Sequence, residues 1–200
     1  MALAGQWTSP YLWSFVVGFS SLLLYATFGV LDDDLARERF RPPSKGADAV
    51  ALRWIRLSAL AGLIFAPLDS GRLHWSPEVP ALIRVVGIAG FLIGFWLVLH
   101  AMRANRFFSA VIRIQGERGH QVVDQGPYAI VRHPGYLGML IVSPMAVLAI
   151  GSWWALVPAG MYTALIARRI VVEDQFLRAN LAGYEQYAVR VQHRVIPGVW

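Results

Sequence analysis

Residues 81–102 read ALIRVVGIAGFLIGFWLVLHAM, an apolar run with one formal charge, Arg84, near its start. A helix needs about 20 mostly apolar residues to cross the hydrocarbon core of a bilayer. This run meets that requirement and is the cleanest such stretch in the chain. It predicts a membrane-spanning helix and places the chain among all-α, polytopic membrane proteins.

Four further apolar runs predict additional spans, so that about five are expected in total. They lie at residues 11–31, 52–68, 137–150 and 153–170. Only Gly151 and Ser152 separate the last two runs, which predicts a tight antiparallel hairpin. The run at 137–150 is short for a full span and is expected to be tilted or partly interfacial.

The first span and the segment after it carry interfacial and polar residues. Trp7, Tyr11 and Trp13 are expected to anchor the span at the membrane interface. Residues 32–48 contain the acidic triplet Asp32-Asp33-Asp34 and the breakers Pro42-Pro43. No second acidic cluster accompanies the triplet, so we expect a solvated loop there rather than a metal site.

The composition fits one integral membrane domain over residues 1–200. The hydrophobic fraction is 56% and the charged fraction is only 15%, as expected for a membrane protein. The net charge of +6 does not indicate nucleic acid, because the basic residues lie between apolar runs and no nucleic-acid motif occurs. The chain has no Cys, which excludes disulfides, thiolate metal sites and Cys nucleophiles.

The distribution of basic residues predicts the topology. Sixteen of the 18 Lys and Arg residues fall in residues 32–56, 103–136 and 168–194, whereas Arg72 and Arg84 lie in or beside the loop between the second and third spans. Basic residues favour the cytoplasmic side. We therefore expect the polar segments and the tail to face the cytoplasm, the N-terminus to lie outside, and the first apolar run to be a retained helix rather than a signal peptide.

The longest polar stretch, residues 103–136, ends in Arg132-His133-Pro134-Gly135-Tyr136. Pro134 lacks a backbone donor and biases His133 away from the helical conformation, and Gly135 permits close backbone approach. The turn is therefore expected to open the fourth helix, whose N-terminus would attract an anion. The same sequence is also compatible with a purely structural helix N-terminus whose Arg and His side chains lie at the membrane interface.

Three ionisable residues admit both a functional and a structural interpretation. Arg169 and Glu173 are four residues apart and share a helix face, so they could form an ordinary ion pair. Alternatively, Arg169 could bind a carboxylate bidentately and Glu173 an amine, a ribose or a sulfonium. His120 could be solvated or could contact a nucleoside. The chain lacks metal-ligand spacings such as His-x-x-x-His, and no metal is expected.

The last segment, residues 171–195, is amphipathic. Its apolar residues recur at helical spacing and comprise Phe176, Leu177, Leu181, Tyr184, Tyr187 and Val191. We expect a helix that is interrupted near Gly183, lies over the membrane face and caps the site.

The combined motifs resemble the isoprenylcysteine carboxyl methyltransferases, which belong to a wider group of integral membrane methyltransferases that includes phospholipid N-methyltransferases. The resemblance covers roughly residues 100–198. It lies in Gly-x-Tyr-x-x-x-Arg-His-Pro-x-Tyr-x-Gly, then Arg-Ile-x-x-Glu, then Leu-x-Gly-Tyr-x-x-Tyr and a closing Pro. Ala110 and Arg113 depart from the pattern of the eukaryotic enzymes, which have His and Gln there.

The resemblance implies a methyltransferase core in residues 81–200, after two N-terminal spans in residues 1–80. It implies S-adenosylmethionine as the methyl donor and a lipophilic, isoprenylcysteine-like carboxylate as the acceptor, with Arg169 at the acceptor carboxylate. The implied cofactor contacts are His120, Gln121, Val122, Val123, Tyr128, His133, Pro134, Gly135, Tyr136 and Glu173.

Several alternatives stay open at this point. A phospholipid or other lipophilic amine could be the acceptor, a membrane reductase could use NADPH with a similar architecture, or the chain could be a sensor or transport accessory without activity. The expected partners are a lipophilic or lipidated acceptor and membrane lipid, with neither nucleic acid nor an obligate protein partner.

Overall fold

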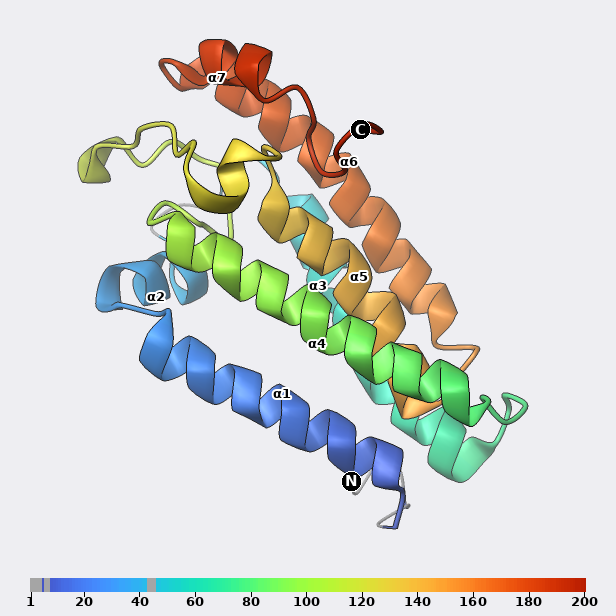
Figure 1. Ribbon diagram of the computed structural model, residues 1–200. Helices are drawn as coiled ribbons and strands as arrows, with labels where there is room; N and C mark the ends of the chain where they lie inside the picture. Colours follow the sequence, from blue (N-terminus) through green and yellow to red (C-terminus); the bar gives the residue numbers. More distant parts are fainter. Residues whose placement is uncertain (1–4, 6–7, 43–45) are drawn as a thin grey trace.

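The computed structural model describes residues 5, 8–42 and 46–200 of the chain (Figure 1). The expectations for Trp7 and Pro43 lie outside these residues. Within them the structure is helical and contains no strand. The helices are α1 (Pro10–Gly29), α2 (Asp33–Phe40), α3 (Ala49–Leu68), α4 (Ala81–Ala104), α5 (Pro134–Ile150), α6 (Leu156–Asn180) and α7 (Tyr184–Arg190). A π-helical turn, η1 (Asp69–Leu73), extends α3, and the short 3₁₀ turns η2 (Gly116–Arg118) and η3 (Gly126–Ala129) interrupt the long connection after α4.

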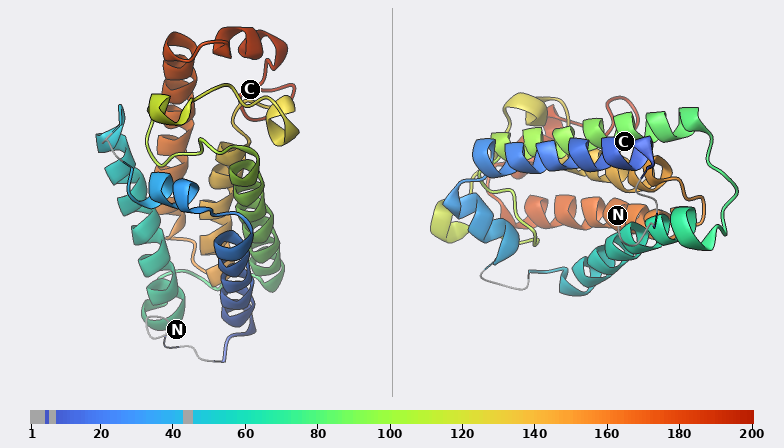
Figure 2. Two further views of the ribbon diagram at one scale, coloured as in Figure 1. Left: turned by 90° about the vertical axis from the view of Figure 1, so that its left-hand side faces the viewer. Right: turned by 90° about the horizontal axis from the view of Figure 1, so that it is seen from below.

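The five long helices run alternately in opposite directions along one bundle (Figures 1 and 2). Helix α2, the connection between α4 and α5, and α7 therefore gather at one end, whereas the α3–α4 and α5–α6 connections lie at the other. Among the described residues, three helical segments are long and apolar enough to cross a membrane: Pro10–Gly29, Ala49–Leu73 and Ala81–Ala104. Helix α5 is a shorter apolar helix. The all-α membrane class is thus confirmed, while the count of five spans and the external N-terminus stay predictions.

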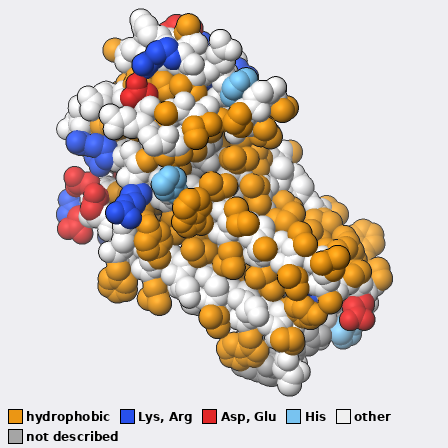
Figure 3. Space-filling model, viewed as in Figure 1, with side chains coloured by type: hydrophobic (Ala, Val, Ile, Leu, Met, Phe, Trp, Pro, Cys, Tyr) orange, Lys and Arg blue, Asp and Glu red, His pale blue; other side chains and the backbone are white. Residues whose placement is uncertain are grey.

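The surface of the bundle agrees with a lipid environment. Apolar side chains such as Leu82, Ile93 and Val157 are more than half exposed. Figure 3 shows hydrophobic side chains along the shaft of the bundle and most of the visible charge at the end that carries α2 and α7. Exposed apolar surface on this scale favours contact with hydrocarbon over contact with water.

Two sequence expectations about boundaries were wrong. Residues 32–48 do not form a simple loop, because Asp32 caps α2 by accepting a hydrogen bond of 2.7 Å from the Leu35 backbone N–H. Carboxylates at Asp33 and Asp34 in the first turn also favour a helix N-terminus. No helix boundary occurs at residue 171, since α6 continues to Asn180. The interruption near Gly183 is confirmed, with φ of +82° at that residue.

Helices α4 and α5 pack with their backbones in close approach. A Cβ atom added to Gly138 would lie 2.3 Å from the Gly94 carbonyl oxygen, and one added to Gly87 would lie 2.6 Å from the Ala149 nitrogen. Small residues permit such approach between helices in membranes, where van der Waals packing replaces the hydrophobic driving force. These glycines set the position of α5 and hence of the turn that precedes it.

The opposite end of the bundle is closed by polar contacts. The fully buried Asp69 accepts hydrogen bonds from the Ser76 and Ser152 hydroxyls and from the Ser76 backbone N–H. Arg84 donates to the Ile150 carbonyl oxygen at 2.9 Å, near the C-terminal end of α5. These contacts join the α3–α4 connection to the five-residue α5–α6 connection, which is longer than the expected two-residue turn.

Candidate functional site

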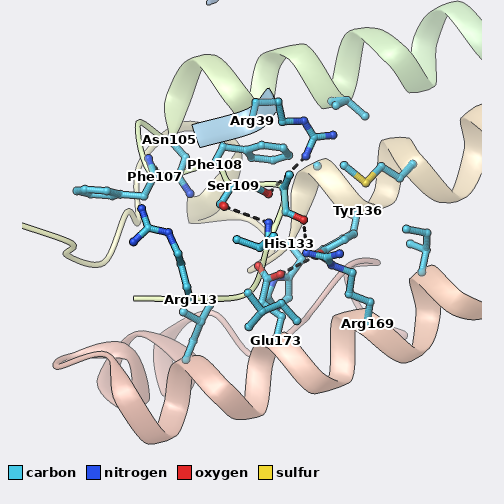
Figure 4. A pocket seen from close by; sticks show the side chains of 18 of the residues that line it. Arg39, Asn105, Phe107, Phe108, Ser109, Arg113, His133, Tyr136, Arg169 and Glu173 are labelled. Carbon is cyan, nitrogen blue, oxygen red and sulfur yellow. Dashed lines mark hydrogen bonds between the residues drawn. The ribbon is translucent and has the colours of Figure 1, made fainter. Parts of the chain in front are cut away.

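A cavity of about 460 Å³ lies at the end of the bundle that carries α2 and α7 (Figure 4). Its walls come from α2, α3 and α4, from the connection between α4 and α5, and from α5, α6 and α7. The volume lies within the range of small-molecule sites. Segments more than 100 residues apart in the sequence therefore line one cavity.

The turn at His133 and Pro134 builds one part of the polar wall. Pro134 is the first residue of α5 and His133 is its N-cap, as the sequence predicts. The backbone N–H groups of Arg132 and His133 donate to the carbonyl oxygens of His193 and Arg194 at 3.0 and 2.8 Å. The turn is therefore fixed against the C-terminal segment.

The fully buried Asp174 holds this wall together. Arg132 donates to both of its oxygens, from Nε at 2.7 Å and from Nη2 at 3.1 Å, and the Tyr184 hydroxyl donates at 3.1 Å. His133 Nε2 lies 3.3 Å from Asp174 Oδ1. Burial alone would raise the pKa of Asp174, but the hydrogen bonds and charges of His133 and Arg132 hold it far below its usual value.

Tyr136 lies between Arg169 and Glu173 in a hydrogen-bonded series. Arg169 Nε donates to the Tyr136 hydroxyl at 2.7 Å, and this hydroxyl donates to Glu173 Oε2 at 2.6 Å. The structure contains no direct ion pair between Arg169 and Glu173. Among the described residues, no Arg, Lys or His side chain lies within ion-pair distance of the Glu173 carboxylate, which lines the cavity.

Arg169 is engaged on its other side as well. Its Nη1 lies 2.7 Å from Asp48 Oδ2, an ionic contact rather than an aligned hydrogen bond, and its Nη2 donates to the Ala110 carbonyl oxygen at 2.8 Å. Both charged side chains are about 5% exposed. Asp48 therefore balances the charge of Arg169 and fixes the guanidinium in the cavity wall.

His120 contributes a neutral ring to the polar wall. Its Nδ1 accepts a hydrogen bond from the Gln115 backbone N–H at 3.2 Å, and its ring centroid lies 4.5 Å from that of Phe107. Burial, together with the charges of Arg113 and Arg118, lowers the pKa of His120 to about 4. The imidazole is therefore uncharged at neutral pH.

Tyr128 closes the cavity beneath α7. The Tyr187 hydroxyl donates to the Tyr128 carbonyl oxygen at 2.7 Å, and burial raises the pKa of both phenols. Each tyrosine is therefore a neutral group. The contact joins η3 to α7, so the terminal helix covers the site as the sequence predicts.

Another part of the cavity wall is apolar. It consists of side chains on the long helices, namely Ile55, Ala59, Phe95, Val98, Met139, Val142 and Ile166. A single cavity therefore offers charged and aromatic groups from the connecting segments and hydrocarbon from the helices.

The structure brings most of the predicted site residues together. Ten of the eleven line this cavity: His120, Gln121, Val122, Val123, Tyr128, His133, Gly135, Tyr136, Arg169 and Glu173. The exception is Pro134, which begins α5 without lining the cavity. Within the part of the chain that the structure describes, no three His, Asp or Glu side chains form a group that could hold a metal ion.

Sequence analysis missed several residues that build the site. The turn motif contains Arg132 without a role for it, and Asp174 follows directly after the last residue of the Arg-Ile-x-x-Glu motif, so an acid next to the predicted Glu173 was a usable signal. Arg39 and Asp48 were assigned to a loop outside the expected core of residues 81–200. No local pattern marks them, because their partners are distant in the sequence.

The fold and the cavity define an all-helical membrane protein whose site is shared between polar connecting segments and membrane helices. A sequence model of the phospholipid methyltransferase family matches residues 82–182. This region contains α4 from its second residue, α5 and α6, and all eleven of the predicted site residues.

Curated proteins from plants and yeast are similar over an overlapping length. The probable protein-S-isoprenylcysteine O-methyltransferase of Oryza sativa subsp. indica is 33% identical over 124 residues, which are 58% of this chain and 61% of the rice protein. Protein-S-isoprenylcysteine O-methyltransferase B of Arabidopsis thaliana is 31% identical over 146 residues, 72% of this chain and 70% of that protein. The protein-S-isoprenylcysteine O-methyltransferase of Schizosaccharomyces pombe is 31% identical over 106 residues, 51% of this chain and 45% of that protein.

The chain therefore belongs to the isoprenylcysteine carboxyl methyltransferase family, and the resemblance read from its motifs is confirmed. It spans about 61% of the length of the rice relatives.

Proposed function

We propose that this protein transfers a methyl group from S-adenosylmethionine to the carboxylate of a lipophilic, isoprenylcysteine-like acceptor. The observation that carries the proposal is the shared cavity, in which the acidic Glu173 and the rings of His120 and Tyr128 face the same space as the apolar residues of α3–α6. A water-soluble donor and a membrane-soluble acceptor need such a shared site. The names of the plant and yeast relatives agree with this reaction.

The residues of the polar wall fit the proposed donor. When bound, S-adenosylmethionine supplies a methyl group activated by a sulfonium. Glu173 has no cation in contact and could bind the positive part of that molecule, and the neutral His120 adds no repulsive charge. Tyr128, Val122 and Val123 offer aromatic and apolar surface for a nucleoside. We propose that His120–Val123, Tyr128, His133–Tyr136 and Glu173 form the donor site.

To bind a carboxylate acceptor, the protein needs a cationic side chain but no general base. A carboxylate is already ionised at pH 7, so the protein has to orient it and exclude water. We assign this orienting role to Arg169, because its guanidinium has five N–H donors and makes three contacts, with Tyr136, Ala110 and Asp48. Ile55, Phe95 and Met139 would surround the hydrocarbon part of the acceptor.

The proposed site faces the cytoplasm. Sixteen of the 18 Lys and Arg residues lie in residues 32–56, 103–136 and 168–194. The described parts of these segments comprise connections at the cavity end of the bundle, the adjoining ends of the long helices and the tail, and basic residues favour the cytoplasmic side. Labelling engineered single cysteines with a membrane-impermeant thiol reagent in intact cells would test this. Reaction at residue 125, beside the cavity, but not at residue 75, at the other end, would place the site outside and contradict the assignment.

Turnover with defined acceptors tests the reaction. The purified full chain in lipid nanodiscs would be incubated with methyl-labelled S-adenosylmethionine and an S-prenylated N-acylcysteine. A carboxyl methyl ester releases methanol in base, so base-labile label in the lipid phase is the expected result. Absence of base-labile product, with protein that binds the donor, would overturn the proposal.

A second candidate function is methylation of a lipid amine, which the match to the phospholipid methyltransferase family favours. An amine must lose a proton before or during transfer. The cavity offers His120, His133 and Glu173 for that role. Label that is stable in base and copurifies with aminophospholipid would support this alternative over carboxyl methylation.

A further inference from the structure

Arg39, on α2, faces the cavity from the side opposite Arg169 and Glu173 (Figure 4). Its Nη1 donates one long hydrogen bond of 3.4 Å to the Ser109 carbonyl oxygen, and its guanidinium carbon lies 5.4 Å from the centroid of the Phe108 ring. Among residues 5, 8–42 and 46–200, no carboxylate lies within ion-pair distance of this side chain. Arg39 thus brings an unbalanced positive charge to the cavity.

The other arginines of the cavity differ from Arg39. Arg113 pairs with Glu38, Arg132 with Asp174 and Arg169 with Asp48, at distances of 2.5 to 2.7 Å. Arg56 has no such partner either, but it is exposed to solvent. Among the described arginines of the cavity, Arg39 is therefore the one that is partly buried and has no carboxylate partner.

Burying a charge without a partner is unfavourable, so an enclosed cation favours binding of an anion. Burial, and then the like charges of Arg169 and Arg56, lower the pKa of Arg39, although an arginine stays protonated at neutral pH. The charge of Arg169 is already balanced by Asp48. Arg39 is accordingly the better placed of the two to attract a further negative group.

Helix α2 holds Arg39 in a fixed position. The adjacent Glu38 is buried and accepts hydrogen bonds from Arg113 Nε at 3.0 Å and from the Ser109 hydroxyl at 2.6 Å. Leu35, one turn earlier, packs in a buried cluster with Val98 and Leu99 of α4. A cation on so firmly anchored a helix can bind a planar carboxylate with little loss of side-chain freedom.

We propose that Arg39 completes the acceptor-anion site: its guanidinium supplies the unbalanced positive charge that binds the carboxylate at the head of a lipophilic acceptor, and Arg169, across the cavity, orients the same carboxylate. This inference rests on the proposed function and makes Arg39 a specificity-determining residue for that reaction. Opposite charges then lie on opposite sides of one cavity, with Arg39 for the anionic acceptor and Glu173 for the cationic donor. Apolar neighbours on α3 and α4, such as Leu52 and Phe95, provide the surface for the hydrocarbon chain.

The test compares the affinity of the full chain in nanodiscs for an S-prenylated N-acylcysteine and for its uncharged carboxamide. Arg39→Gln should weaken binding of the acid by about 10- to 100-fold, as for the loss of a charge-assisted hydrogen bond. It should change the affinity of the carboxamide and of S-adenosylmethionine by less than about threefold. Arg37→Gln removes an exposed charge from the same helix and should leave all three affinities unchanged.

A second substitution covers the case in which Arg39→Gln does not fold. Arg39→Lys keeps the charge but loses the planar fork, so the preference for acid over carboxamide should fall to a value between those of wild type and Arg39→Gln. An unchanged preference in Arg39→Lys, equal losses for acid and carboxamide in Arg39→Gln, or a wild type that does not prefer the acid would each overturn the proposal.

These affinities are measured without turnover and so separate this inference from the proposed function. A wild-type protein that prefers the acid through Arg39 but forms no methyl ester would contradict the proposed reaction alone. Ester formation with an acid affinity that does not depend on Arg39 would contradict the acceptor-anion site alone.

Discussion

Arg132 and Asp174 stand 42 positions apart in the sequence and form a bidentate ion pair, with Nε–Oδ1 and Nη2–Oδ2 distances of 2.7 and 3.1 Å. Both side chains are buried. The pair joins the turn before α5 to α6, and the same carboxylate contacts His133 and Tyr184, which line the cavity. The polar wall of the site therefore depends on one acid that does not line the cavity itself.

Asp174→Asn should destabilise the protein by about 3–5 kcal/mol, because it leaves the buried Arg132 without a compensating charge. Thermal unfolding of the detergent-solubilised protein would measure the loss. Arg178→Ala is the matched control, since Arg178 contacts the same carboxylate at 3.3 Å but is about one-third exposed. Its effect should stay below about 1 kcal/mol, and equal losses in the two variants would contradict the central role of Asp174–Arg132.

His120 should make stability depend on pH in a defined window. Its pKa is about 4 in the folded protein and 6.5 in its ordinary state. The unfolded chain therefore binds more protons between these values, and stability should be complete above pH 6.5 and decline as the pH falls toward 4. Unfolding midpoints measured across this range should decline less steeply in His120→Asn. If the unfolding midpoints of wild type and His120→Asn declined equally with pH, protonation of His120 would not account for the pH dependence of stability.

Gly138→Ala should disrupt the contact between α4 and α5, because the added methyl group would lie 2.3 Å from the Gly94 carbonyl oxygen. A cost of about 1–3 kcal/mol is expected for such overpacking. Gly160→Ala in α6 is the control, since no atom lies within 4 Å of its added Cβ. That substitution should be neutral or stabilise the helix by up to about 1 kcal/mol, and the difference in unfolding midpoint is the measurement.

Arg169→Lys should separate turnover from donor binding. Lysine keeps the charge beside Asp48 but cannot reproduce the hydrogen bonds to Tyr136 and Ala110. We expect kcat to fall by about 100-fold, while calorimetry gives a donor affinity within about threefold of wild type. If the affinity for S-adenosylmethionine fell together with turnover, Arg169 would contact the donor and the assignment to the acceptor would be wrong.

Glu173→Gln should weaken binding of the donor rather than use of the acceptor. The substitution keeps a hydrogen-bond acceptor for the Tyr136 hydroxyl but removes the negative charge from the cavity. The dissociation constant of S-adenosylmethionine is expected to rise by about tenfold or more, and the affinity for the carboxylate acceptor to stay the same or increase. An unchanged donor affinity would show that the cationic group of the donor binds elsewhere.

Much of the fold and of the site could be predicted from local features of the sequence, namely the apolar runs and the Arg132–Tyr136 motif. The thickness of the hydrocarbon core of a bilayer predicts apolar helices of the length of α1, α3 and α4. Helix α5 begins at Pro134, as the turn motif predicts. Gly183, with its positive φ, interrupts the amphipathic segment directly before α7. Such features depend on one short stretch of chain and its solvent, so they can be read without knowledge of any neighbour.

Other features could not be predicted from the sequence, because they depend on contacts with residues that are distant in the chain. The segment around Arg39 is polar and resembles a loop, yet Asp32 caps it as a helix and Glu38 pairs with Arg113, 75 residues later. Arg169 and Glu173 have the spacing of a direct ion pair, but Tyr136 from α5 lies between them. Helical spacing shows which residues share a face, whereas the facing helix decides which contacts form.

The sequence by itself determined the membrane class, the family and the part of the cavity wall that ten of its eleven proposed site residues form, because hydropathy and motif chemistry are local properties of the chain. Tertiary structure alone decided which charges are balanced: Asp174 with Arg132, Asp48 with Arg169, and Arg39 with no carboxylate among the described residues. The reason is physical. In a low-dielectric interior, the energy of a charge depends on the groups packed within a few ångströms of it, and those groups come from distant parts of the sequence.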